Sequence, residues 1–212
     1  KVEPLADTIG AANTLTVQDD GSLYASNTDY DAALDAVCDG LSITREELKG
    51  QRIAVVGAGG AARAIVAGFA HYGATVVIYN RTRQRADDLA NEFNGRTGKV
   101  VAANIDKLCD SCCQVYINCT PIGMHPKTDA TPMPLDTMTR QGKGWGPGTV
   151  VFDTIYNPIN TRLIREARSV GCVTIPGTEM FVRQAAGQFT LWTRADAPID
   201  LFRRVLTEQL TA

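Results

Sequence analysis

The chain has 212 residues, of which 44% are apolar and 21% charged, and its formal net charge at pH 7 is −2. These values are ordinary for a soluble globular protein and give no reason to expect a nucleic acid or an anionic membrane as a partner. No apolar run approaches the roughly 18–20 residues that cross a bilayer, and the first residues show no signal-peptide pattern. We therefore expect a cytoplasmic protein.

The first part of the chain is predicted to form a β-hairpin followed by a helix. Residues 13–18 and 23–26 have the pattern of two short strands, and Asp19-Asp20-Gly21-Ser22 supplies the turn between them. Thr28–Cys38 then has apolar residues at helical spacing. Because the first thirty or so residues cannot form a domain alone, we interpret them as the end of one.

From residue 48 onward, short β-branched runs alternate with segments of helical period, which predicts βαβ units. Strands are expected at Ile53–Val56, Thr75–Tyr79, Val100–Val101, Gln114–Asn118, Val150–Asp153 and Val173–Ile175. Helices are expected near 62–69, Arg83–Phe93, Ile105–Cys109, Asn160–Ser169, Glu179–Thr193 and Ile199–Leu210, with 127–148 mostly a loop. The predicted fold class is α/β, with a Rossmann-type parallel sheet and flanking helices.

A glycine-rich loop, Gly57-Ala58-Gly59-Gly60-Ala61, follows the first of these strands and opens a helix. In this context Gly57 permits a tight turn, Gly59 lets a pyrophosphate approach the backbone, and Ala62 keeps the helix close to the strand. The start of the helix offers free N–H groups and a partial positive charge to phosphate. The loop therefore predicts dinucleotide binding.

The end of the second predicted strand indicates which dinucleotide is bound. An NAD-binding domain usually places Asp or Glu there to accept from the ribose 2′-hydroxyl, but this chain has Asn80 followed by Arg81, Arg83 and Arg85. Guanidinium groups pair with a 2′-phosphate that a carboxylate would repel. A solvated basic face is the alternative; the position at the start of a helix, where cations oppose the macrodipole, favours NADP.

Six cysteines raise the alternative of a redox or metal site. The spacing Cys109-x-x-Cys112-Cys113 is compatible with a redox pair or half of a zinc site. His71 and His125 do not stand at the spacing that would complete a zinc site. We expect free thiols in a reducing compartment and no metal.

Seven short motifs occur in order along the chain, and together they resemble the shikimate dehydrogenase family from about residue 9 to the C-terminus. They are Ile9-Gly10-Ala11-Ala12-Asn13-Thr14, Asn27-Thr28-Asp29, the glycine-rich loop, Asn80-Arg81-Thr82, Asn118-x-Thr120-x-x-Gly123-Met124, Asp153-x-x-Tyr156-x-Pro158 and Gly177-x-Glu179-Met180-Phe181-x-x-Gln184-Ala185. The resemblance implies NADPH-dependent reduction of 3-dehydroshikimate to shikimate, on the route to chorismate and the aromatic amino acids.

The resemblance also implies roles for individual residues. Substrate-binding residues would be Asn13, Asp29, Tyr156 and Gln184, with Asp29 also the catalytic acid in proton transfer. Cofactor-binding residues would be Gly57, Ala58, Gly59, Gly60, Ala61, Asn80, Arg81, Thr82, Arg85, Thr120, Ile155, Gly177 and Met180. Taken singly, Asn13 and Tyr156 are more typical of turns and Gln184 of an exposed helix face, whereas Asp29 could equally be an N-cap.

Three parts of the chain follow from the resemblance: 1–29, the remnant of an N-terminal α/β substrate domain; 30–176, the NADP-binding Rossmann domain; and 177–212, C-terminal helices that return towards the substrate domain. The family's catalytic lysine lies well before the position of Asn13, and Lys1 is too close to be that residue. We expect a fragment that lacks this lysine and is poorly active alone. Tyr30 after Asn27-Thr28-Asp29 resembles plant enzymes with a fused 3-dehydroquinate dehydratase, so a dehydratase domain upstream is a further expectation.

Two alternatives stay open on the sequence alone. One is a quinate/shikimate dehydrogenase that uses NAD. The other is a nucleotide-binding regulatory module that has lost catalysis.

Overall fold

The computed structural model describes residues 1–139 and 144–211. Its strands are β1 (Thr14–Val17), β2 (Leu23–Ser26), β3 (Arg52–Val56), β4 (Thr75–Tyr79), β5 (Lys99–Ala103), β6 (Val115–Asn118), β7 (Val150–Asp153) and β8 (Val173–Ile175). Its α-helices are α1 (Pro4–Ile9), α2 (Thr28–Leu41), α3 (Gly60–His71), α4 (Arg83–Phe93), α5 (Leu135–Met138), α6 (Arg162–Ser169), α7 (Gly177–Thr193) and α8 (Ile199–Thr211). Two 3-10 segments are η1 (Glu46–Leu48) and η2 (Ile105–Asp110).

Six parallel strands form the main sheet, in the order β5-β4-β3-β6-β7-β8. This is the doubly wound order, in which the chain runs outward from the centre first on one side and then on the other. The reversal falls between β3 and β6, which pair with Val56 opposite Asn118. The predicted α/β class is confirmed, and ligands of such sheets bind beyond the carboxyl ends of the strands at this reversal.

Alternate residues of the central strands face two separate apolar layers. Ile53 and Val55 of β3 pack with the buried faces of α2, α3 and α4, whereas Ala54 and Val56 pack with η2, α5 and α6. Strands covered on both faces need apolar residues throughout, which is why β3 reads as an unbroken aliphatic run. Both faces of the sheet are therefore covered, and the carboxyl ends of its parallel strands lie at one edge.

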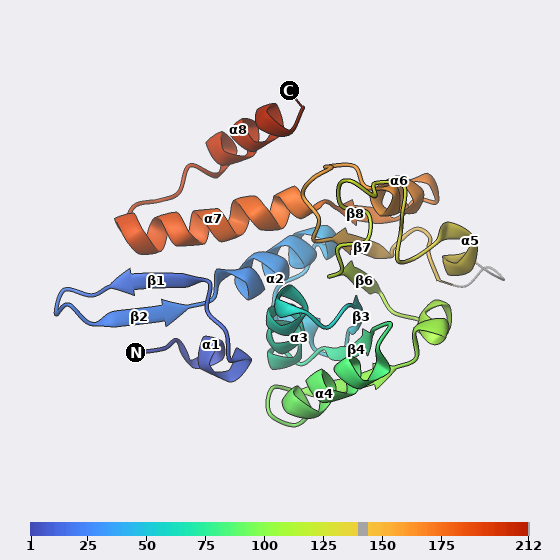
Figure 1. Ribbon diagram of the computed structural model, residues 1–212, viewed down its shortest axis with the longest axis horizontal. Coiled ribbons are helices and arrows are strands. Elements are labelled where there is room, and N and C mark those ends of the chain that lie inside the picture. Colours follow the sequence, from blue (N-terminus) through green and yellow to red (C-terminus); the bar gives the residue numbers. More distant parts are fainter. Residues whose placement is uncertain (140–143, 212) are drawn as a thin grey trace.

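The hairpin of β1 and β2 lies at the far side of α2 from the main sheet, beside α7 (Figure 1). Its strands pair antiparallel, with Thr14 opposite Ser26. Trp192 Nε1 in α7 donates to the Leu15 carbonyl oxygen at 3.0 Å, and Gln188 Nε2 donates to Thr14 Oγ1 at 3.2 Å. The long helix α7 therefore joins the hairpin to the sheet domain.

Most predicted elements are observed within one to three residues of their expected bounds, but one expectation is wrong. The segment expected as a helix at Ile105–Cys109 is the 3-10 segment η2, as is common for short stretches that cannot offset the cost of nucleating an α-helix. The segment 127–148, predicted to be mostly a loop, contains the one-turn helix α5; its residues 140–143 lie outside the described range. In the described ranges, none of the helices combines the length and apolar content that crossing a bilayer requires.

Candidate functional site

The glycine-rich loop crosses the carboxyl end of the sheet between β3 and α3. Gly57 has a φ of 120°, and a Cβ there would lie 2.8 Å from the carbonyl oxygen of Cys119, so only glycine fits where β3 and β6 end side by side. At Gly59 and Gly60 a Cβ would meet nothing within 4 Å. Gly59 is the N-cap of α3 and no side chain caps this helix start. The loop is closed towards the sheet and open outward, a shape that fits a pyrophosphate at a helix N-terminus.

A hollow of about 450 Å³ lies against this loop, and Asn80, Arg81 and Arg85 line it together with Gly57, Ala58 and Gly59. Arg81 and Arg85 are exposed, and neither has a carboxylate within ion-pair distance in the ranges 1–139 and 144–211. The hollow thus joins a phosphate cradle to two available guanidinium groups.

Arg83 lies between these two arginines in sequence but has its own protein partners. Its Nε donates to Asp87 Oδ1 at 2.9 Å, and its Nη1 donates to Asn104 Oδ1 at 2.7 Å. Asn80 Nδ2 donates to the Thr82 carbonyl oxygen at 2.8 Å, which fixes the turn between β4 and α4. The predicted basic run therefore divides into two residues at the hollow and one that secures α4.

A second hollow, of about 400 Å³, adjoins the first. It is lined by Thr120 from the loop after β6 and by Ile155 and Tyr156 from the loop after β7. The two hollows share Cys119, Thr120 and Pro121, so they follow one another along the carboxyl ends of the strands. This arrangement can hold the two halves of an extended ligand.

Three predicted substrate residues meet at the start of α2. Asn13 Nδ2 donates to Asp29 Oδ1 at 2.9 Å and reaches Gln184 Oε1 at 3.5 Å. The N-cap of α2 is Asn27, whose Oδ1 accepts from the Asp29 backbone N–H at 2.9 Å. Asp29 is therefore not the cap of this helix. Burial raises the pKa of the Asp29 carboxyl, and the hydrogen bond from Asn13 opposes that rise.

Helix α7 connects this polar cluster to the second hollow. The rings of Tyr156 and Phe181 lie with their centroids 4.8 Å apart, and Gln184 follows Phe181 by three residues, which places both on the same face of α7. The predicted substrate residues from the hairpin, α2, α7 and the loop after β7 are thus on one side of the molecule.

The other predicted cofactor residues do not line either hollow. Gly177 begins α7 against the loop after β7, where a Cβ would come within 2.4 Å of the Ile155 carbonyl carbon and oxygen. Met180 is buried in the core shared with α2 and α3. Thr82 is the exposed N-cap of α4, while Gly60 and Ala61 form the first turn of α3.

Several lining residues were not predicted from the sequence. Ile105 and Pro132 line the first hollow, and His125 lines the second. They belong to η2 and to the loops after β6, where neither periodicity nor a motif points to a ligand. Only the motif around Thr120 and Gly123 marked this part of the chain.

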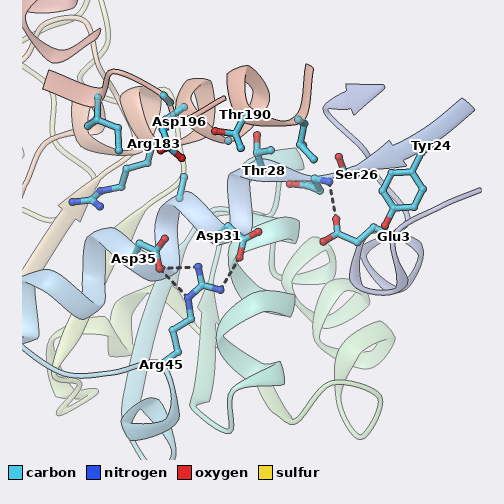
Figure 2. A pocket seen from close by; sticks show the side chains of 17 residues that line it. Glu3, Tyr24, Ser26, Thr28, Asp31, Asp35, Arg45, Arg183, Thr190 and Asp196 are labelled. Atoms are coloured by element: carbon cyan, nitrogen blue, oxygen red, sulfur yellow. Dashed lines mark hydrogen bonds and ion pairs between the residues drawn. The ribbon is translucent and has the colours of Figure 1, made fainter. Parts of the chain in front are cut away.

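The largest hollow described, about 740 Å³, lies elsewhere, between α2 and α7 (Figure 2). Figure 2 shows Arg45 held by Asp31 and Asp35, each at 2.7 Å, and Glu3 nearby. Arg183 is likewise paired, with Asp39 at 2.7 Å. Because its lining is rich in carboxylates and its arginines are engaged, this hollow does not suit an anionic ligand.

Comparisons with known proteins point to one family. The model of the family described as shikimate / quinate 5-dehydrogenase matches residues 41–120, and that of the shikimate 5′-dehydrogenase C-terminal domain matches residues 177–207. A relative from Methanosarcina mazei, named shikimate dehydrogenase (NADP(+)), is 40% identical over 100% of this chain and 73% of its own length.

Two further relatives add a solved structure and a longer protein. A solved shikimate dehydrogenase in complex with NADP+ has a TM-score of 0.85 and 31% identity, covering 100% of this chain and 71% of that one. A chloroplastic protein of Arabidopsis thaliana, named bifunctional 3-dehydroquinate dehydratase/shikimate dehydrogenase, is 36% identical over 98% of this chain and 35% of its own length.

Proposed function

The chain belongs to the shikimate dehydrogenase family, and from this premise we propose that it catalyses the reversible, NADP-dependent reduction of 3-dehydroshikimate to shikimate. The structural observation that supports the proposal most directly is the hollow that combines the glycine-rich loop with Asn80, Arg81 and Arg85. The names of the M. mazei relative and of the solved neighbour agree with NADP as cofactor. The reaction places the chain in the route to chorismate and the aromatic amino acids.

The nucleotide's adenosine 2′-phosphate would lie between Arg81 and Arg85. Both arginines line the first hollow, and an arginine presents paired donors that match the oxygens of a phosphate. The pyrophosphate would lie on Gly57–Gly60, where the open Cβ positions of Gly59 and Gly60 leave room for it. The nicotinamide half would then extend into the second hollow, towards Thr120 and Ile155. Bound NADPH supplies the hydride for the reaction.

The substrate would be held by Asn13, Asp29, Gln184 and Tyr156. Reduction of a ketone adds a hydride to the carbonyl carbon and a proton to its oxygen, so the site needs a group that holds a proton near that oxygen. Burial raises the pKa of Asp29, which favours its protonated form and suits it to this role. Asn13 and Gln184 are already within hydrogen-bond reach of one another and present amides to substrate hydroxyls.

We further propose that residues 30–176 are the NADP-binding domain and that residues 1–29 and 177–212 form the substrate side. Contacts between the two end segments support this division. Besides the bonds from Trp192 and Gln188 to β1, Arg194 Nη2 donates to Asp19 Oδ1 at 2.8 Å in the hairpin turn.

The proposal is tested with shikimate and quinate added separately to the chain saturated with NADP+. Two readouts are the absorbance of newly formed NADPH and the heat of binding of each compound. We expect shikimate to bind in preference to quinate and to be oxidised, at the low rate expected above for this chain alone. A chain that binds NADP+ but neither binds nor oxidises shikimate would instead be a regulatory nucleotide-binding module.

A further inference from the structure

A buried carboxylate lies beneath the two hollows, at the end of β7. Asp153 has no exposed surface. Its Oδ1 accepts hydrogen bonds from Asn118 Nδ2 at 3.0 Å and from the Ile155 backbone N–H at 3.1 Å, and its Oδ2 accepts from Thr161 Oγ1 at 2.6 Å. Three donors from three segments of the chain thus satisfy both oxygens of the carboxylate.

Asn118, at the end of β6, carries this connection to the neighbouring loop. It is also fully buried, and its Oδ1 accepts from the backbone N–H of Thr120 at 2.9 Å and from Thr120 Oγ1 at 2.7 Å. Its own carbonyl oxygen accepts from the Thr154 backbone N–H at 3.0 Å. Asp153 and Asn118 together fix the first residues of the loops that follow β6 and β7.

These two loops are the walls of the second hollow. Thr120 belongs to the loop after β6 and Ile155 to the loop after β7. Ile155 is hydrogen-bonded to the Asp153 carboxylate directly, and Thr120 is connected to it through Asn118. An apolar residue could fill the same space without the cost of burying a charge. That cost is evident here, because burial raises the pKa of Asp153 to about 6. A carboxylate is needed only if the donors around it must be held in place.

We propose that Asp153 is a positioning residue for the nicotinamide half of the dinucleotide, holding Thr120 through Asn118 and Ile155 through its backbone N–H. The inference rests on the proposed function, because it requires that NADP(H) occupy the two hollows. Asp153 is buried and would not contact the dinucleotide itself. It would set the separation between the loop after β6 and the loop after β7. The adenosine half lies against Gly57–Gly60, Arg81 and Arg85, which have no hydrogen bond to this network in the parts of the chain that are described.

The test compares two ligands, NADP+ and adenosine 2′,5′-bisphosphate, which has the 2′-phosphate but no nicotinamide. In Asp153→Ala the donors of Asn118, Ile155 and Thr161 lose their acceptor, so we expect NADP+ binding to weaken about tenfold. Binding of the bisphosphate should change by less than about twofold, since its proposed contacts with Arg81, Arg85 and Gly57–Gly60 make no hydrogen bond to the network, although Thr120 also borders the first hollow. Titration calorimetry measures both affinities.

Two further variants separate positioning from general destabilisation. Asp153→Asn should restore NADP+ binding, because its Oδ1 can accept from Asn118 and Ile155 while its amide donates to Thr161. Tyr116→Phe is the matched control: it removes a buried hydroxyl, bonded to Ser111 Oγ at 3.1 Å, from the same strand β6. Its ratio of NADP+ to bisphosphate affinity should equal that of the wild type.

Each outcome bears on the inference separately from the proposed function. Equal weakening of both ligands in Asp153→Ala, or unchanged NADP+ binding, overturns the positioning role. A wild-type chain that does not bind the bisphosphate overturns the proposed function instead. If Asp153→Ala does not fold, Thr161→Val decides. It removes one donor to the carboxylate and, with it, the acceptor for the Ile164 N–H at the start of α6. A loss of NADP+ affinity without a loss of bisphosphate affinity supports the inference, and unchanged NADP+ affinity overturns it.

Discussion

Arg81 and Arg83 are separated by one residue but have different surroundings. Arg81 lines the first hollow, whereas Arg83 is bound to Asp87 and Asn104. We expect Arg81→Ala to weaken NADP+ binding about 10- to 100-fold, since a hydrogen-bonded charge pair with the 2′-phosphate is lost. NAD+ binding should change little. Arg83→Ala is the matched control and should affect both nucleotides equally and weakly. Titration of both variants with both nucleotides checks this; equal losses for NADP+ and NAD+ in Arg81→Ala would make Arg81 structural.

The proton-transfer role of Asp29 can be tested without disturbing the fold. Asn27, not Asp29, caps α2, so Asp29→Asn leaves the helix start intact. Loss of a positioned acid typically lowers turnover by about 10²- to 10⁴-fold, and we expect a loss of that size in shikimate oxidation with unchanged NADP+ affinity. Steady-state rates and a parallel nucleotide titration measure the two effects. Near-normal turnover would remove Asp29 from proton transfer.

Asp153 also makes the stability of the protein depend on pH. Burial raises its pKa from 3.8 to about 6, so the folded protein holds a proton that the unfolded chain has released. The stability that this group contributes is fully present below about pH 4 and is lost as the pH rises through about 6. The loss is on the order of 3 kcal/mol. Urea unfolding from pH 4 to pH 7 should show this decline relative to Asp153→Asn; parallel profiles for the two proteins would disprove the assignment.

At the scale of elements, the start of α7 is fixed by close contact with the loop after β7. A Cβ at Gly177 would lie 2.4 Å from the Ile155 carbonyl group. Alanine normally stabilises a helix relative to glycine, but here we expect Gly177→Ala to cost about 1–3 kcal/mol through overpacking. Gly146→Ala is the control, because a Cβ there meets nothing within 4 Å. Thermal unfolding compares the stabilities of the two variants. A Gly177→Ala protein as stable as the wild type would show that the loop after β7 can move to make room for the added Cβ.

The sequence predicted those elements in which the local residue pattern matches the way the element packs in the folded protein. Strand β3, the glycine-rich loop and α3 could be predicted because aliphatic runs, glycine spacing and helical period coincide there. Helix α1 was not predicted, since six residues beginning at Pro4 show no clear period. The buried network of Asp153 was not predicted either: its partners come from three segments, and no local pattern records which strands become neighbours.

At the scale of the molecule, the hairpin has its apolar residues on the outward face. Leu15, Val17 and Leu23 are 59%, 69% and 54% exposed, while the alternate residues Thr14 and Ser26 are buried. The period of two predicted both strands correctly, but the usual assignment of the apolar face to the core would place them the wrong way round. Which face is covered depends on α7, which begins at Gly177, 151 residues after the hairpin ends at Ser26.

Helix α7 and the carboxyl ends of the strands bring the nucleotide hollows and the substrate residues to one side of the molecule. The nucleotide site is the part on which all further roles depend, and its preference for NADP is the central claim. The most direct test is titration of the wild-type chain with NADP+ and NAD+ under identical salt conditions. We predict that NADP+ binds at least about tenfold more tightly. Equal affinities, or a preference for NAD+, would contradict the account.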